Sequence, residues 1–195
     1  MSAAGRVATG FSEPWVAKYA ASSGTVTYSD AQKLARGVSV SIEPETSDDN
    51  KFYADNIAAE VAAGIFTGGT ATLTVDGLLT ASKAVIMGTP AADTAGWTAY
   101  GDNQEIPYVG LGFIVRYQSD GEVTYVPTVL AKVAFEQEAL SAATQEEEID
   151  WQTQELTANI LKDDTTNHNW KFEGAAQTTE ALALAALKTK LGVTP

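Results

Sequence analysis

"YVGLGFIVRYQSDGEVTYVPTVLAKVAF", residues 108–135, decides the fold because two runs of alternating apolar residues flank a turn dipeptide. The apolar residues form two rows: Val109, Leu111, Phe113, Val115 and Tyr117 in the first run, and Val123, Tyr125, Val129 and Val133 in the second. Apolar residues at every second position are typical of a strand with one buried face. Asp120-Gly121 suits a primed hairpin turn, and Gly110 and Gly112 leave room for close backbone approach. The stretch therefore predicts an antiparallel β-hairpin.

Two further segments, residues 38–42 and 70–75, show the same alternation. In the first, apolar residues share one face and serines the other: Val38, Val40 and Ile42 against Ser39 and Ser41. The connection between the two segments, from Glu43 to about Gly64, is polar and acidic at first and apolar later. A loop of this length in a compact domain is usually functional or disordered. "TGGT" at 67–70 lacks the Lys of a phosphate-binding loop, so we predict a turn there.

Residues 76–88 and 178–192 show helical spacing. In the first segment Asp76 can cap the N-terminus, and Gly88 sits where a C-terminal glycine is expected. In the second, Thr178 or Thr179 can provide the cap, and a leucine stripe marks the buried face: Leu184, Leu187 and Leu191. With six to eight strands and these two helices, the chain predicts a mainly β fold, a β-sandwich or small barrel with peripheral helices.

"TQEEEIDWQTQELTANI", residues 144–160, changes its apolar face part of the way along. The apolar residues stand at odd positions first, Ile149 and Trp151, and at even positions later, Leu156, Ala158 and Ile160. The switch falls near Gln154. A one-residue slip turns every side chain over, so a bulge there would restore a single core face. Alternatively, each half of the strand meets a different partner, one inside the subunit and one outside.

Composition limits the possible functions. The chain has 195 residues and a net charge of −13, which disfavours attraction to nucleic-acid backbones or anionic lipid. It has no cysteine, hence no disulfide or thiolate site, and this is compatible with a reducing compartment. No apolar run approaches the roughly 20 residues of a membrane helix, and the first 15 residues lack a signal-peptide core. We therefore expect one domain, made in the cytoplasm, with no membrane association.

The sequence offers no convincing catalytic, cofactor or metal site. Three consecutive glutamates, Glu146, Glu147 and Glu148, point in different directions, and no second ligand cluster accompanies them. Residues 45–56 resemble a calcium loop only superficially, because the alternate ligands, the central Gly and the closing Glu are absent. His168 is the only histidine, and no "GxSxG" elbow accompanies it. We predict that the protein is not an enzyme and has no cofactor.

Four phrases in order resemble the major tail protein, or tail tube protein, of long, non-contractile-tailed bacteriophages and related prophages. They are "SIEPETSDDNKFYADN", "FTGGTATLTVDGL", "GWTAYGDNQEIPYVGLGFIVRYQSDG" and "AATQEEEIDWQTQELTANI". The resemblance spans roughly residues 13–172. It implies an N-terminal arm (1–13), a tail tube β-sandwich domain (14–172) with one flanking helix and a long loop at about 43–64, and a C-terminal helical extension (173–195).

The resemblance further implies a structural protein that assembles into hexameric rings, stacked into a hollow tube through which DNA leaves the capsid. One sheet of each subunit would join its neighbours around the lumen, and the long loop would reach the adjacent ring. Partners would be other copies of the chain and the tape measure, tail terminator and distal tail proteins of the same virion. DNA would pass without specific binding. The tube would be assembled in the host bacterial cytoplasm.

Two groups of residues are the predicted assembly sites. Apolar side chains of the long loop would pack on another subunit: Phe52, Tyr53, Ile57 and Val61, with Ile65 and Phe66 beyond them. Some of seven acids would give the lumen or an interface a negative charge: Glu146, Glu147, Glu148, Asp150 and Glu155, with Glu136 and Glu138. Alternatively, Glu146, Glu147 and Glu148 solvate an outer loop. No Lys or Arg occurs from Val133 to Leu161.

Two other classes of function remain open. A virion or surface β-sandwich that binds carbohydrate or decorates a shell would use exposed aromatic residues such as Trp97 and Tyr100, as a monomer or small closed oligomer. A metal-assisted hydrolase would use the acidic stretches and lose its activity with a chelator.

Overall fold

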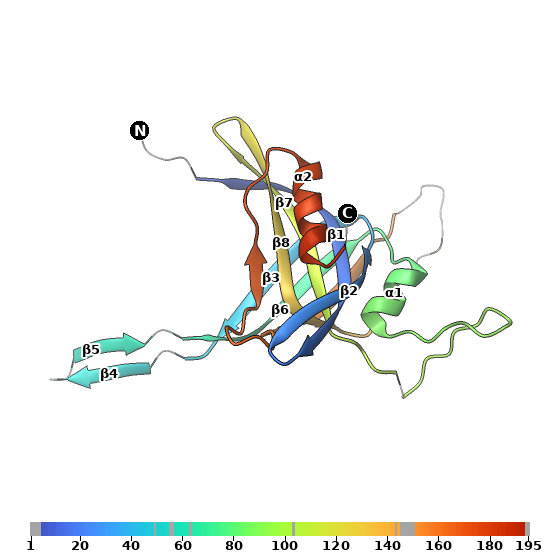
Figure 1. The fold of residues 1–195 in the computed structure, drawn as a ribbon, viewed down its shortest axis with the longest axis horizontal. Helices are drawn as coiled ribbons and strands as arrows, with labels where there is room; N and C mark the ends of the chain where they lie inside the picture. Colours follow the sequence, from blue (N-terminus) through green and yellow to red (C-terminus); the bar gives the residue numbers. More distant parts are fainter. Residues whose placement is uncertain are drawn as a thin grey trace.

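Figure 1 shows the computed structural model, which describes residues 5–48, 50–54, 57–62, 64–102, 104–142, 144 and 151–193. Within these residues the chain forms ten strands and two helices: β1 (Val7–Ser22), β2 (Thr25–Lys33), β3 (Gly37–Thr46), β4 (Asn50–Ala54), β5 (Ile57–Ala62), β6 (Phe66–Val75), α1 (Thr80–Met87), β7 (Val109–Ser119), β8 (Glu122–Phe135), β9 (Gln154–Leu161), β10 (Lys171–Glu173) and α2 (Glu180–Lys190). The fold is mainly β, as the sequence predicts.

Eight of the strands form one antiparallel sheet. Seven follow the order β2-β1-β7-β8-β9-β6-β3, and β10 pairs with β8; β4 and β5 pair only with each other. The sheet curls, so that the start of β3 contacts β1 although the two strands are not neighbours. A Cβ atom added to Gly37 of β3 would lie 2.1 Å from the ring of Phe11 in β1. The concave side of the curled sheet encloses the main core.

The sheet has apolar side chains on both faces. The main core includes Leu73, Leu111, Phe113, Leu130, Phe135, Leu156 and Ile160, and α1 adds Val85 and Ile86. On the opposite face α2 covers β7 and β8, and a smaller core contains Ala17, Ile114, Val129, Ala183, Leu187 and Leu191 (Figure 1). The close approach of α2 depends on Gly112, where a Cβ atom would lie 2.7 Å from Cδ1 of Leu187.

The predicted hairpin is confirmed as β7 and β8. Asp120 and Gly121 have φ angles of 48° and 85°, which a primed turn requires. The prediction that Val129 and Val133 belong to one apolar row is wrong, because Val129 packs in the smaller core and Val133 in the main core. The pairing shifts between Val109–Val133 and Leu111–Leu130, so β8 gains one residue relative to β7. This bulge turns over the side chains that follow it.

The strands predicted at 38–42 and 70–75 are confirmed as parts of β3 and β6. Val40 and Ile42 pack on the main core, but Val38 is exposed because the register shifts between Gly37 and Ser39. The turn predicted at 67–70 is wrong, because all four residues belong to β6. Gly69 lets β3 approach, since a Cβ atom there would lie 2.6 Å from the carbonyl oxygen of Glu43.

Both predicted helices are present. Gly88 ends α1 in the left-handed conformation, as expected, but Asp76 does not cap its N-terminus; it accepts hydrogen bonds from the backbone and side chain of Arg36 instead. In α2 the cap is Thr179, whose hydroxyl accepts from the backbone N–H of Leu182 at 3.3 Å. Gly192, at φ 76°, follows its end.

Among the described residues of this segment, 144 and 151–160, only those from Gln154 onward belong to a strand. β9 begins at Gln154, and its register with β6 is regular from Val75–Gln154 to Gly69–Ile160. A bulge near Gln154 is therefore wrong as an explanation of the change of face. Trp151 lies before the strand, and its side chain is 83% exposed. At the N-terminus, residues 7–13 of the expected arm form the first part of β1 and pair with β7.

Candidate assembly surfaces

The solvent-facing side chains of β3, β6 and β9 form a polar face on the curled sheet. Strand pairing aligns them in three rows: Ser39–Thr74–Glu155, Ser41–Thr72–Thr157 and Glu43–Thr70–Asn159. The rows arise because the alternate residues, Leu73 and Leu156 among them, are buried in the main core. We call these nine residues the polar face. It places Glu155, one of the predicted lumen acids, at one corner of a surface that sequence alone did not reveal.

The polar face has no positive charge of its own. β3, β6 and β9 contain no Lys or Arg, and their acids are Glu43, Glu45 and Glu155. Glu136 extends the surface, since its backbone N–H donates to the carbonyl of Thr157 at 2.8 Å. The surface is therefore rich in hydroxyl groups and carries charge of one sign.

Two cations lie at the border of this surface: Lys162, which follows β9 and lines a hollow with Thr70 and Asn159, and Lys132, which is neutralised within the subunit. Lys132 of β8 forms an ion pair with Asp164 at 2.8 Å, and its side chain is only 13% exposed. Its ammonium group also lies 4.5 Å from the ring centroid of Tyr108 and 5.2 Å from that of Tyr19. Lys132 therefore contributes little field to the polar face.

Glu138, another of the predicted acids, is held by an ion pair and a hydrogen bond within the subunit. Its carboxylate pairs with Lys83 of α1 and accepts a hydrogen bond from Nε2 of Gln154 at 2.8 Å. Oε1 of Gln154 in turn accepts from the backbone N–H of Leu78 at 3.3 Å. These bonds join α1 and the residue Leu78 before it to Glu138 and Gln154, which lie at the two ends of the acidic connection between β8 and β9. Glu138 therefore anchors that connection. Four of the predicted acids, Glu146, Glu147, Glu148 and Asp150, lie outside the described residues.

The connection predicted as a loop at 43–64 contains a hairpin. β4 holds Phe52 and Tyr53, and β5 holds Ile57 and Val61; Phe52 pairs with Glu60 and Tyr53 with Ala58. The hairpin extends β3 and β6 away from the body of the domain, to the left in Figure 1. At its base the N–H of Ser47 donates to the carbonyl of Ile65 at 2.9 Å. The structure therefore brings the four predicted residues together on one projecting element.

The sheet ends in two strands that each have one neighbour among the described strands. β2 pairs with β1, and β3 pairs with β6, so the outer edge of each is unpaired within the described subunit. Exposed edges invite pairing with another chain, and natural proteins protect them or use them for assembly. Pro44 in β3 lacks an N–H donor and restricts such pairing to part of the edge.

The shifted ionisable groups lie in ion pairs and hydrogen bonds of the scaffold. Burial raises the pKa of Tyr19 to about 12, and its hydrogen bond to Asp164 adds to the effect. The Lys132 ammonium and the Tyr19 hydroxyl lower the pKa of Asp164. Hydrogen bonds from Arg36 lower the pKa of Asp76. Burial tends to raise the pKa of Glu13, but hydrogen bonds from Lys33 and Trp15 outweigh it, and the pKa is lowered. These groups stabilise the fold.

Within the described part of the chain, no group of three His, Cys, Asp or Glu residues could hold a metal ion, and no helix is long and apolar enough to cross a bilayer. His168 lies in a turn at φ 50°, with Nδ1 3.3 Å from the carbonyl oxygen of Asp163. A scan against protein-family models and a search of curated proteins both give no match to this chain.

Proposed function

We propose that this chain is a tail tube protein of a long, non-contractile-tailed phage or a related prophage. Copies of it would form hexameric rings, and the rings would stack into the tube that conducts DNA from the capsid to the host. The observation that carries the proposal is the polar face. Its nine residues include no cation, no helix of the described residues covers it, and it lies partly on β3 and β6, the strands that also carry the projecting hairpin.

The polar face suits the wall of a DNA channel. Double-stranded DNA carries one negative charge per roughly 1.7 Å of axis, and lysines on the wall would bind it by releasing counterions. A wall of hydroxyl groups with Glu43, Glu136 and Glu155 offers no such grip. Because screening limits these interactions to about 8 Å at physiological salt, the charge of the lumen surface matters more than the net charge of −13. DNA would therefore slide without specific binding.

The edges and the hairpin supply the contacts that a tube needs. Pairing the edge of β2 or β3 with a neighbouring copy would continue the sheet around a ring and remove the exposed edge. The β4–β5 hairpin projects beyond the domain in one direction and would reach the next ring (Figure 1). The residues predicted to make this contact with the next ring are Phe52, Tyr53, Ile57 and Val61. No step in this account needs a catalytic residue, a metal or a cofactor.

The place of the protein in the virion follows from the same proposal. The tube would enclose a tape measure protein during assembly and end on terminator and distal tail proteins. Assembly would take place in the bacterial cytoplasm, and the mature location would be the virion tail.

The surface-binding alternative draws on a separate observation. In the connection between α1 and β7, the side chains of Trp97 and Tyr100 are 77% and 56% exposed, as a carbohydrate site requires. Aromatic residues that are exposed on a free subunit are also common at assembly interfaces, where they become buried. The alternative predicts a monomer or a small closed oligomer, so the oligomeric state separates it from the tube.

Negative-stain microscopy of purified protein tests the proposal. We expect rings or hollow tubes, and an obligate ring interface should bury on the order of 2,000 Å² or more. A particle that remains monomeric at high concentration by light scattering, with no larger form by microscopy, would count against the tube. Sugar-dependent binding by such a monomer, lost on replacing Trp97, would favour the alternative.

A further inference from the structure

We infer that Trp151 of one copy inserts into the cavity between α2 and strands β8 and β10 of a second copy. This inference rests on the proposed function, because it describes how neighbouring subunits would contact each other. It concerns a surface distinct from both the polar face and the hairpin. Three observations carry it: a cavity of suitable size, a lysine at its rim without an acidic partner, and an exposed tryptophan on an acidic segment.

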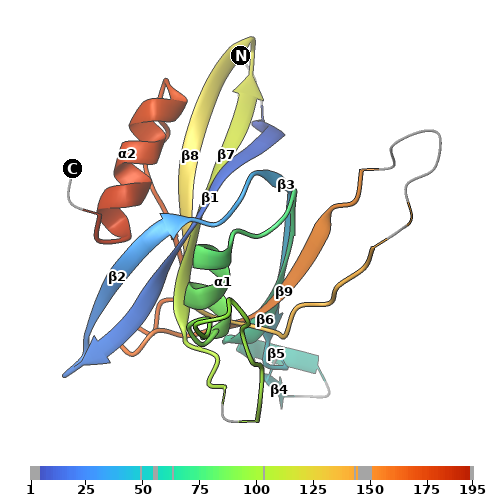
Figure 2. The same ribbon diagram turned by 90° about the vertical axis from the view of Figure 1, so that its right-hand side faces the viewer.

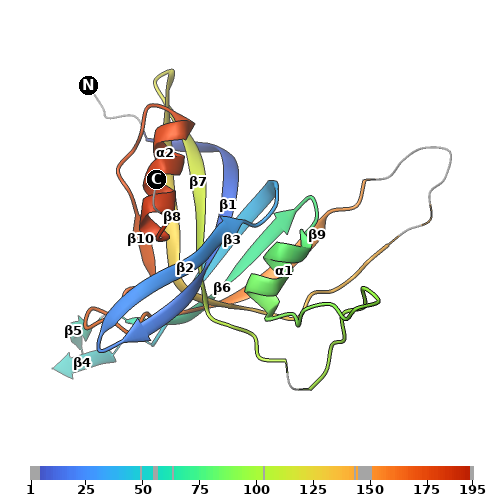
Figure 3. The same cartoon turned by 45° about the vertical axis from the view of Figure 1, so that its right-hand side comes forward.

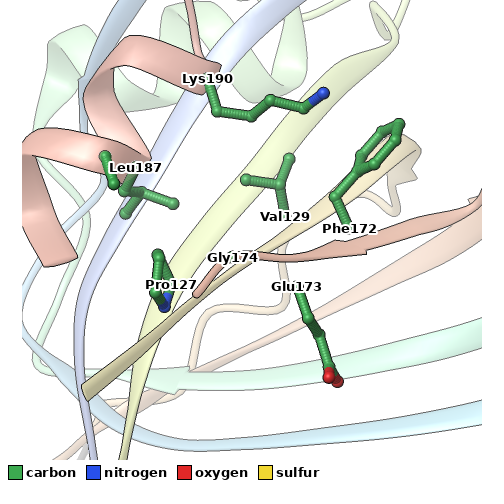
Figure 4. Close-up of a pocket in the computed structure, with 8 residues that line it drawn as sticks. Pro127, Val129, Phe172, Glu173, Gly174, Leu187 and Lys190 are labelled. Atoms are coloured by element: carbon green, nitrogen blue, oxygen red, sulfur yellow. The ribbon is translucent and has the colours of Figure 1, made fainter. Parts of the chain in front are cut away.

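The cavity is lined mainly by apolar groups. Figure 4 shows Pro127 and Val129 of β8, Phe172 of β10 and Leu187 of α2 around it, with Lys190 reaching over it and Glu173 pointing away. Its volume is about 240 Å³. An engineered apolar cavity of about 150 Å³ accepts benzene. The cavity between α2 and the sheet therefore has room for the two rings of an indole.

The rim of the cavity is cationic. Nζ of Lys190 lies 3.7 Å from the ring centroid of Phe172, and among the described residues no carboxylate forms an ion pair with Lys190. Lys171 is close by in β10 but is paired with Glu173 at 2.8 Å. An aromatic side chain that enters the cavity would meet the Lys190 ammonium, and this contact is worth roughly 0.5–2 kcal/mol depending on desolvation. Acidic side chains beside that aromatic residue would also be attracted to the Lys190 ammonium.

Trp151 is an aromatic residue of this kind. Its side chain is 83% exposed, and that of Leu140, in the other stem of the same connection, is 91% exposed. In the sequence Trp151 follows four acids within five residues, Glu146, Glu147, Glu148 and Asp150. A large exposed aromatic side chain next to concentrated negative charge complements an apolar cavity whose lysine has no carboxylate partner among the described residues. Buried aromatic anchors of this type supply most of the energy of many interfaces.

The two surfaces lie on opposite sides of one subunit. In Figures 2 and 3 the described stems of the acidic connection, residues 136–142 and 151–153, project from the side of the sheet opposite α2. Trp151 therefore cannot reach the cavity of its own chain. A contact between two different surfaces is heterologous, and repeating it closes a ring when the rotation fits. Each subunit would give Trp151 to one neighbour and receive that of another.

The absence of cysteine from the chain allows a direct test. Trp151→Cys is made in one preparation and Ala186→Cys, at the cavity, in another; the two are mixed, assembled and treated with a short bis-maleimide. The linker is needed because a disulfide joins only Cα atoms within about 7 Å. We expect a cross-linked dimer on a denaturing gel. Val38→Cys, at an exposed position in β3 that does not line the cavity, is the control and should cross-link far less.

A cavity-filling variant provides a second test. Ala186→Trp should occupy the cavity and abolish assembly, whereas Ala185→Trp, on the same helix but outside the lining, should leave it intact. Tubes that form without the cross-link and tolerate Ala186→Trp would overturn this inference and leave the proposed function standing. A protein that is monomeric in every preparation would overturn both.

Discussion

The packing of α2 on the sheet can be tested with a double-mutant cycle at Gly112 and Leu187. Leu187 is 1% exposed, and its Cδ1 would lie 2.7 Å from a Cβ atom at Gly112. Leu187→Ala removes buried methyl groups and leaves a cavity, so we expect the free energy of unfolding to fall by about 2–5 kcal/mol. Gly112→Ala crowds the same space, and overpacking of this kind costs about 1–3 kcal/mol.

The two changes should compensate each other, because the methyl group added at Gly112 occupies space that Leu187→Ala vacates. The double variant should therefore lose less stability than the sum of the single variants, with a coupling of about 0.5–3 kcal/mol. For a chain of this size each kcal/mol shifts Tm by about 2–4 °C. The Leu191 side chain also lies near Gly112, at 2.9 Å from the added Cβ atom, and limits how complete the compensation can be.

The assay is urea and thermal unfolding of unassembled protein, followed by circular dichroism. Ala185→Gly, at an exposed position on the same helix, is the control for helix propensity and should cost only about 1 kcal/mol. Additive effects of Gly112→Ala and Leu187→Ala, within about 0.5 kcal/mol, would refute the packing of α2 on β7 and with it the cavity described above.

Three further changes test other surfaces. Replacing Thr72 and Thr157, cross-strand neighbours on the polar face, with lysine should slow DNA ejection from particles that still assemble, and added salt should restore the rate. Glutamine at both positions is the control, and an unchanged ejection rate in the lysine variant would contradict a lumen location. Deleting the β4–β5 hairpin, residues 50–62, should leave a folded subunit that cannot stack, so full-length tubes from this variant would rule out an inter-ring role. Asp164→Asn should lower the pKa of Tyr19 from about 12 towards the ordinary value of about 10, measured by ultraviolet absorbance during alkaline titration. An unchanged titration would show that burial alone raises the pKa of Tyr19.

The parts of the fold that depend on neighbouring residues in the sequence could be predicted. Asp120-Gly121 determines the turn between β7 and β8, and Gly88 and Thr179 determine helix ends, through local backbone conformation and hydrogen bonding. The bulge between Leu130 and Val133 could not be predicted. It is recorded only in the pairing of β8 with β7, so the alternating row appeared continuous in the sequence.

Sequence alone led to a wrong prediction for residues 67–70 and did not reveal the polar face or the partner of Glu138. Thr67–Thr70 has the composition of a turn, but Gly69 instead permits β3 to approach β6 closely. The polar face could not be predicted either, because its rows join β3, β6 and β9 from distant parts of the chain. Alternation of polar and apolar residues within single strands, such as Ser39 and Ser41 or Thr70, Thr72 and Thr74, was the local signal of it in the sequence. The ion pair of Glu138 could not be predicted, because its partner, Lys83, is 55 residues away in the sequence.

Helical reconstruction by cryo-electron microscopy of tubes assembled from the purified protein tests the central claim most directly. The proposal predicts a hollow tube whose lumen is lined by Ser41, Thr72 and Thr157, with α2 away from the lumen. A tube that places these three residues on its outer wall, or a protein that forms no tube under any condition, would contradict it.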